Sequence, residues 1–108
     1  MSKYHLGEFE EIVMLTVAIL GSEAYGIAII DEMERRLKRE VSIGSLQTVL
    51  RRLEKKECLK SKFGEATKIR GGKRKRFFTI TAYGKKVLSE TKEQRNRLWD
   101  AVPEFSFE

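Results

Sequence analysis

The feature that most constrains this chain is the segment 42–57, SIGSLQTVLRRLEKKE, whose apolar residues recur at helical spacing. They follow the i, i+3, i+4, i+7 pattern of a single helix face and are Leu46, Val49, Leu50 and Leu53. Ser42 stands directly before them, where a hydroxyl can cap a first-turn amide. The segment therefore predicts a helix with one buried side.

The other side of this helix carries only small polar and cationic residues, so its N-terminal end could enter a DNA major groove. An ordinary surface helix with a solvated basic face is the alternative interpretation. Under the first interpretation we predict DNA contacts from Ser45, Gln47, Thr48, Arg51, Arg52 and Lys55.

The positive charge of the chain is concentrated in one region. The formal net charge is +6, and residues 51–76 alone hold twelve Lys or Arg against three Glu. A localised basic patch is expected of a protein that binds the phosphate backbone of nucleic acids. A membrane surface is the competing partner, but the basic stretch lacks the Trp, Phe and Leu face of an interfacial helix. We therefore expect double-stranded DNA as the partner, and no membrane.

The length and composition exclude several classes of protein. With 108 residues and 41% hydrophobic content, the chain suits one small domain with a single core. The lone Cys58 predicts no intramolecular disulfide and no zinc cluster, and no segment approaches the ~20 apolar residues that span a bilayer. A cytoplasmic protein without metal or cofactor is expected. With its single His5 in the N-terminal tail, the chain offers no nucleophile–base pair, so an enzyme is not expected.

The N-terminal part of the chain predicts two helices and a short extended segment. The first helix begins at Glu8 and ends at Gly21, and the second begins at Ser22 or Glu23. Gly26, inside the second helix, suggests a close approach between helices. Residues 41–43 are too short for a helix and favour a stub of edge strand.

Beyond the segment 42–57 the pattern becomes extended. Residues 59–63 and 76–81 have the composition of strands, and Gly71-Gly72 between them favours a turn. The cation-rich tip of this predicted hairpin, residues 68–76, contains no acid, although a solvated flexible loop is the alternative. We predict phosphate or minor-groove contacts from Lys73, Arg74, Lys75 and Arg76.

A last helix is predicted from the Thr81 cap to about Ala101, before Pro103. It carries an apolar seam with a period near 3.5 residues, which is typical of a helix that packs along another helix. Packing on its own domain is the alternative to a second chain. The residues expected at the interface with a second copy are Val87, Leu88, Thr91, Leu98, Trp99 and Val102.

The order helix, helix, short strand, helix, hairpin, helix is that of a winged helix-turn-helix, and the chain resembles the PadR family of bacterial transcriptional regulators from Leu6 to Trp99. The resemblance is carried by short motifs, which are Tyr25-Gly26, Gly44-Ser45-Leu46, Leu50-Arg51-Arg52-Leu53-Glu54, and Phe77-Phe78-Thr79-Ile80-Thr81 with Gly84. It implies a mainly α protein with a small β-hairpin, in which residues 1–80 form the DNA-binding domain and residues 81–108 the dimerisation helix and tail.

Several positions depart from the family pattern. One is Cys58, which stands where an aliphatic residue is normal and is therefore expected to be a small core residue rather than a redox sensor. Gln47 stands where Tyr is usual, Ile43 where Pro is common, and Glu57 where a Gly would end the recognition helix. The last departure predicts either a non-Gly residue in a left-handed cap or a differently shaped helix end.

The resemblance also implies a function. Members of the family bind palindromic operators as homodimers, act mostly as repressors, and in many cases respond to small molecules. In some members a Trp on the last helix lines a site for flat apolar compounds, so Trp99 is the residue expected to contact a small aromatic effector. A winged helix used as an RNA- or protein-binding module is the alternative function, and the small polar residues and Arg of segment 42–57 favour duplex DNA.

Overall fold

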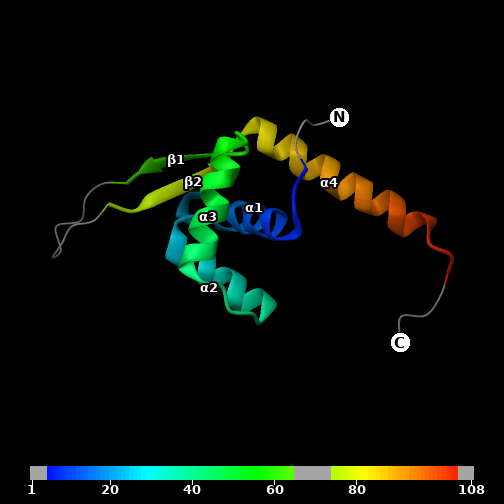
Figure 1. Cartoon of the computed structure of the whole chain (residues 1–108), viewed down its shortest axis with the longest axis horizontal. Helices are drawn as coiled ribbons and strands as arrows, with labels where there is room; N and C mark the ends of the chain where they lie inside the picture. The colour runs from blue at the N-terminus through cyan, green and yellow to red at the C-terminus, as the bar shows by residue number, and fades with distance from the viewer. Residues whose placement is uncertain (1–4, 65–73, 105–108) are drawn as a thin grey trace.

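The computed structural model describes residues 5–64 and 74–104 and shows a winged helix-turn-helix followed by a long helix (Figure 1). The elements in chain order are α1 (Glu8–Leu20), the 3-10 turn η1 (Gly21–Glu23), α2 (Gly26–Leu37), α3 (Ile43–Lys55), β1 (Leu59–Phe63), β2 (Arg76–Ile80) and α4 (Ala82–Ala101). The predicted fold class, mainly helical with one hairpin, is confirmed. The hairpin extends from the helices on the side opposite to the end of α4.

The central helix α3 forms as its sequence predicts. The Ser42 hydroxyl accepts a hydrogen bond of 3.1 Å from the Ser45 amide and so caps the first turn. All four apolar side chains of the predicted face are buried, none more than 6% exposed. The helix ends two residues before the predicted limit because Glu57 adopts a left-handed conformation with φ 63°. The sequence predicts either a non-Gly residue in a left-handed cap or a differently shaped helix end, and the structure has the left-handed cap, with Glu57 in it.

The connection between α1 and α2 differs from the prediction. Residues Gly21–Glu23 form a 3-10 turn, so α2 begins at Gly26 rather than at Ser22 or Glu23. The intervening backbone is extended and joins the hairpin: the Phe78 amide donates to the Ala24 carbonyl at 2.8 Å, and Tyr25 bridges to Phe77. A helix starting earlier would lose these hydrogen bonds to the wing. Gly26 is the first residue of α2 and does not lie inside the helix. The close helix approach predicted there is wrong, because a Cβ on Gly26 would meet only the Ile43 side chain, in ordinary contact at 3.5 Å.

The predicted strand stub at residues 41–43 is also wrong. Ile43 is the first residue of α3, and Ser42 is its cap. The Val41 amide donates to the Glu34 carboxylate at 3.1 Å instead of to a strand partner. Within the described residues, the segment that pairs with a hairpin strand is therefore the one around Tyr25, which bridges to Phe77, and not residues 41–43.

The two strands pair antiparallel with the register Leu59↔Ile80, Ser61↔Phe78 and Phe63↔Arg76 on one face. At the base of the hairpin, Leu59 and Phe78 are buried against the helices. Farther out, Phe63 is 56% exposed, so the same face continues from the core to the surface. The predicted Gly71-Gly72 turn lies outside the described residues.

The core lies where α1, α2 and α3 meet the base of the hairpin. Its largest fully buried side chains include Met14, Ile29, Met33, Leu46 and Leu53. Cys58 is also fully buried, and burial raises the pKa of its thiol. It is a core residue, as expected from a position that is normally aliphatic in the family pattern.

Helix α4 starts on the core and then leaves it. The Thr81 hydroxyl caps the helix by accepting from the Gly84 amide at 2.9 Å, and it donates to the Glu57 carbonyl at 2.6 Å. Val87 is 1% exposed, so the first turns of α4 belong to the domain core. The C-terminal half extends beyond the other helices (Figure 1). No helix within the described part of the chain is long and apolar enough to cross a bilayer.

Candidate nucleic-acid interface

The exposed side of α3 presents the residues that the sequence predicts for DNA contact. The side chains in that set are all solvent-exposed and are Ser45, Gln47, Thr48, Arg51, Arg52 and Lys55. Two hydroxyls among them have local partners: the Ser45 hydroxyl accepts from the Ser42 hydroxyl at 2.8 Å, and the Thr48 hydroxyl donates to the Gly44 carbonyl at 3.0 Å. Each of these oxygens keeps further hydrogen-bonding capacity for a base or a phosphate.

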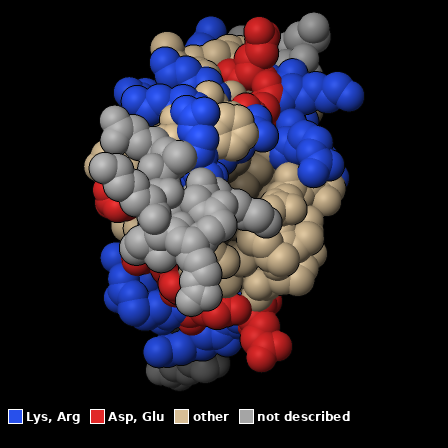
Figure 2. Space-filling model, turned by 90° about the vertical axis from the view of Figure 1, so that its left-hand side faces the viewer, with Lys and Arg blue, Asp and Glu red and all other residues tan. Residues whose placement is uncertain are grey.

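A groove of about 590 Å³ separates α3 from the hairpin. Apolar side chains from three elements line it, with polar and charged residues beside them, and the lining residues are Gly26, Ile27, Ile43, Gln47, Leu50, Arg51, Glu54, Arg74, Arg76 and Phe78. Figure 2 views the molecule from the wing side and shows an uncharged surface that is bordered by Lys and Arg side chains and also by Asp and Glu side chains. Gln47 and Arg51, both predicted from the sequence, thus face the same space as two wing cations.

Three wing cations are positioned by aromatic rings. The Arg74 guanidinium lies 5.7 Å from the Phe63 ring centre, and its Nε donates to the Gly64 carbonyl at 2.8 Å. The Lys75 ammonium lies 4.2 Å from the ring centre of Tyr25. Cation–π contacts of this kind limit the freedom of long side chains while leaving the charge accessible. Lys73 lies outside the described residues.

Arg76 is the third of these cations and differs from the others because its guanidinium is already bound within the chain. It donates from Nη2 to Glu54 Oε1 at 2.9 Å and from Nε to Ser61 Oγ at 2.8 Å. It also lies 5.6 Å and 5.7 Å from the ring centres of Phe63 and Phe78. The sequence predicts a phosphate contact here, and the structure shows that two of the five N–H donors of this guanidinium are already bound to α3 and β1.

Arg52 does not line the groove, although the sequence predicts it as a DNA contact together with Arg51. Its charge acts on Glu10 of α1, whose carboxylate accepts two hydrogen bonds from the Lys56 ammonium, at 2.8 and 3.0 Å, and one from the Gly7 amide at 2.8 Å. Burial raises the pKa of Glu10, but these hydrogen bonds and the charges of Lys56 and Arg52 outweigh burial and leave it below the ordinary value. This cluster joins the end of α3 to α1.

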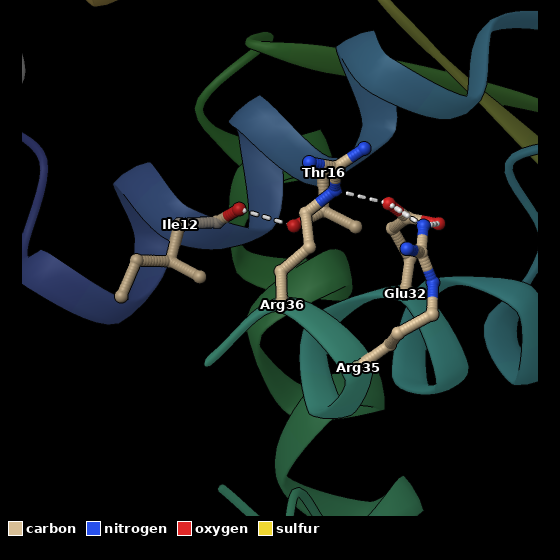
Figure 3. Close-up of polar contacts among 5 residues, drawn as sticks. All are labelled: Ile12, Thr16, Glu32, Arg35 and Arg36. Atoms are coloured by element: carbon tan, nitrogen blue, oxygen red, sulfur yellow. Dashed lines mark hydrogen bonds and ion pairs between the residues drawn. The ribbon is translucent and has the colours of Figure 1, made fainter. Parts of the chain in front are cut away.

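Glu32 is a second buried carboxylate with internal partners. It points from α2 toward α1 and receives hydrogen bonds from Arg35, at 2.7 and 2.8 Å, and from Arg36 (Figure 3). The bonds from Arg35 and Arg36 lower the pKa of Glu32. Nearby, the Thr16 hydroxyl donates to the Ile12 carbonyl at 2.8 Å. These polar groups stabilise α1 and α2 internally, and we assign them no ligand.

In the structure, the predicted apolar seam of α4 has two parts, of which the first packs on the chain's own core and the second is exposed. Val87 is expected at an interface with a second chain, but it is buried in its own domain and has almost no surface left for a partner. Leu88 packs against the same core, and the Thr91 hydroxyl donates to the Val87 carbonyl at 2.8 Å. The remaining apolar residues are exposed: Leu98 is 71%, Trp99 58% and Val102 40% exposed. Val87 follows the periodicity of the seam, but periodicity does not say which surface covers a helix face.

Sequence reasoning missed several residues of the groove. Ile27 and Ile43 are 58% and 44% exposed and line the groove beside α3, and Glu54 lines it too. Ser61, which does not line the groove, donates a hydrogen bond to Glu54 and so connects the hairpin to α3. One signal was available, since the alternation Leu59, Ser61, Phe63 places Ser61 on the same strand face as a buried leucine. Among residues 5–64 and 74–104, no three His, Cys, Asp or Glu side chains are grouped to hold a metal ion.

Comparison with known proteins finds a matching family model and a relative of similar sequence. The model of the transcriptional regulator PadR-like family matches residues 14–90. An uncharacterised protein of Lysinibacillus sphaericus is 36% identical over 86 residues, which cover 78% of this chain and 74% of that protein.

Solved structures show the same similarity. A PadR-like transcription factor from Bacteroides fragilis is 26% identical with a TM-score of 0.73, over 87% of this chain and 85% of that one. A PadR family transcriptional regulator from Eggerthella lenta is 28% identical with a TM-score of 0.68, over 88% and 82%.

Proposed function

Because the chain belongs to the PadR-like family of transcriptional regulators, we propose that it binds a palindromic operator as a homodimer and represses transcription. The observation that carries this proposal is the groove between α3 and the wing. It brings Gln47 and Arg51 of α3 to the same space as Arg74 of the wing, so base edges and a phosphate backbone can be contacted together.

Within this interface, the side chains of α3 determine which DNA sequence is bound. An Arg donates two hydrogen bonds to the O6 and N7 atoms of guanine, and a Gln pairs with the N6 and N7 atoms of adenine. Arg51 and Gln47 are exposed on neighbouring turns of a helix that is capped at its polar N-terminal end. The wing cations Arg74 and Lys75, together with Lys73, contact phosphates or the minor groove and position the protein without selecting bases.

Dimerisation through the end of α4 accounts for the exposed apolar residues there. Leu98, Trp99 and Val102 present apolar surface on a helix that extends beyond the domain, and two such helices would cover each other. On α1, Leu15 and Ile19 are 46% and 52% exposed and are available to enlarge the contact. A two-fold symmetric dimer requires an operator with two inverted half-sites, about 34–36 Å apart centre to centre or a multiple of this distance.

A small planar aromatic molecule is the effector that we propose for release from DNA. Trp99 is the contact, because this residue is 58% exposed and its indole ring offers stacking area near the proposed dimer axis. A molecule bound there would act on the two DNA-binding domains through α4, whose first turns are part of each domain core.

Selection from a randomised duplex DNA library tests the proposed function directly. We expect enrichment of an inverted repeat, and we expect the enriched duplex to bind in preference to its scrambled version at equal salt. Structured RNA of equal length is measured alongside. Failure to enrich any duplex, or tighter binding to RNA at matched salt, would replace this proposal with the RNA- or protein-binding alternative.

A further inference from the structure

Glu54 closes a ring of hydrogen bonds that joins three elements of the DNA-binding region. Its Oε1 accepts from Arg76 Nη2 at 2.9 Å, and its Oε2 accepts from Ser61 Oγ at 2.6 Å. Ser61 Oγ in turn accepts from Arg76 Nε at 2.8 Å. The three side chains come from α3, β1 and β2, so the ring connects the recognition helix to both strands of the wing.

The position of this ring suggests that it fixes the wing relative to α3. Glu54 follows Arg51 by one turn of α3 and lines the same groove, while Arg76 stands at the outer end of the paired strands, opposite Phe63. The Arg76 guanidinium also makes cation–π contacts with the rings of Phe63 and Phe78. Beyond the buried base of the hairpin, these contacts tie its outer half to α3.

Glu54 could affect DNA binding through its negative charge or by positioning the wing, and the two effects predict opposite results when the carboxylate is removed. A carboxylate in a groove that receives DNA repels phosphate, so its removal alone should strengthen binding to any DNA. If the carboxylate instead positions the wing, its removal should weaken binding to the operator, where the helix and the wing must engage at the same time.

We propose that Glu54 is a positioning residue for DNA recognition, which sets the angle between the wing and α3 through Ser61 and Arg76. The inference rests on the proposed DNA-binding function. Glu54 makes no base contact in this proposal, and Arg76 acts mainly as its partner rather than as an independent phosphate contact.

Two substitutions at this position separate positioning from charge. Glu54→Gln and Glu54→Ala both remove one negative charge, but only Gln keeps an acceptor for Arg76 and a polar group for Ser61. We expect Glu54→Ala to weaken operator binding about tenfold, as the loss of two hydrogen bonds predicts. Its binding to scrambled duplex should be unchanged or stronger. Glu54→Gln should bind the operator within about threefold of wild type, a difference of less than one net hydrogen bond.

Glu40→Ala is the matched control. Glu40 lies beside Ser42 and Ser45 at the start of α3, so its removal adds the same charge near α3 without touching the wing. Anisotropy is measured on the selected operator and its scrambled version across a salt series. Equal affinities of Glu54→Gln and Glu54→Ala for the operator, or tighter operator binding by Glu54→Ala, would overturn the proposal.

A second measurement requires no DNA. Amide hydrogen exchange in β1 and β2 should become faster in Glu54→Ala and stay near the wild-type rate in Glu54→Gln. If Glu54→Ala does not fold, Ser61→Ala removes two of the three hydrogen bonds without changing charge, and because the bond between Arg76 and Glu54 remains, a smaller increase in exchange is expected. Wild-type exchange rates in Glu54→Ala, or in Ser61→Ala if Glu54→Ala does not fold, would reject the positioning role. A wild-type protein without operator preference would reject the proposed function alone.

Discussion

The carbonyl oxygen of Cys58 occupies the position that a side chain at residue 84 would need. A Cβ built on Gly84 would lie 2.2 Å from this oxygen and 3.0 Å from the Cys58 carbonyl carbon. The same carbonyl accepts a hydrogen bond from the Thr81 amide at 3.1 Å, so it cannot turn away without cost. The start of α4 thus packs directly on the backbone that follows α3.

Gly84→Ala should therefore destabilise the protein by about 1–3 kcal/mol, the usual cost of overpacking a tightly packed site. Urea denaturation at a fixed protein concentration measures this change, with the slope of the transition unchanged. Gly44→Ala is the control, because a Cβ on Gly44 meets nothing within 4 Å and α3 gains helix propensity. Equal stability of the two variants would contradict the close packing at Gly84.

Arg51→Ala and Arg74→Ala should weaken DNA binding in different ways. Removing Arg51 should cost about 1–3 kcal/mol on the operator and little on scrambled DNA, because Arg51 would bind a base edge. Removing Arg74 should weaken both and reduce the salt slope by about one unit for each phosphate that the side chain neutralises. Anisotropy from low to high salt measures both effects. If Arg51→Ala weakened both duplexes equally, α3 would not be the element that reads bases.

Leu98→Asp should convert the proposed dimer into a monomer. Leu98 is 71% exposed in the single chain, so the substitution should leave the monomer folded while placing a charge in the apolar interface. Sedimentation velocity at micromolar concentration measures the state, and circular dichroism checks the fold. Ile27→Asp is the control, since Ile27 is 58% exposed but lies at the groove. A monomeric wild-type protein would contradict the dimer.

The Glu10 and Lys56 pair should make stability depend on pH in the acid range. The pKa of Glu10 is lowered in the folded protein, so its ionised form adds stability above the ordinary value of 4.5. This stability is lost as the pH falls through the lower folded pKa. Lys56→Met should cost about 1–3 kcal/mol at pH 7, because it removes partners of a buried carboxylate.

The difference between Lys56→Met and wild type should shrink as the pH falls through the lowered pKa of Glu10 in the wild-type protein, because the carboxyl group is then protonated in both proteins. Thermal or urea unfolding at several pH values measures it. Lys55→Met removes the same charge from the neighbouring, exposed position and should leave stability nearly unchanged. A cost for Lys56→Met that does not vary with pH would show that Lys56 acts through packing alone.

Trp99 should report the binding of a planar aromatic effector. It is the single Trp of the chain, so intrinsic fluorescence follows this residue directly. Saturable quenching is expected on titration, with weaker binding by Trp99→Ala and near-normal binding by Trp99→Phe, which keeps a stacking ring. Binding to Trp99→Ala can be followed by calorimetry. A panel of such compounds without quenching would leave Trp99 as a packing residue.

Local sequence patterns determined the secondary structure of much of this protein. The apolar spacing and the Ser42 and Thr81 caps predict α3 and the start of α4, because both depend on residues within a turn or two of each other. The strand composition locates β1 and β2 for the same reason. The exposed side of α3, with Gln47 and Arg51, follows from the buried side, since the two are opposite faces of one helix.

Only the tertiary structure decided which distant groups meet. Tyr25 pairs with the wing, Val87 enters the core, and Glu54 binds Arg76 across 22 residues of sequence. A helical or strand pattern states that a face must be covered but not by what, because the partner is set by how whole elements pack. Clustered Lys and Arg residues in the sequence therefore predict a DNA-binding face. The packing of α3 against the wing determines which of these cations already have a partner within the chain, as Arg76 has in Glu54.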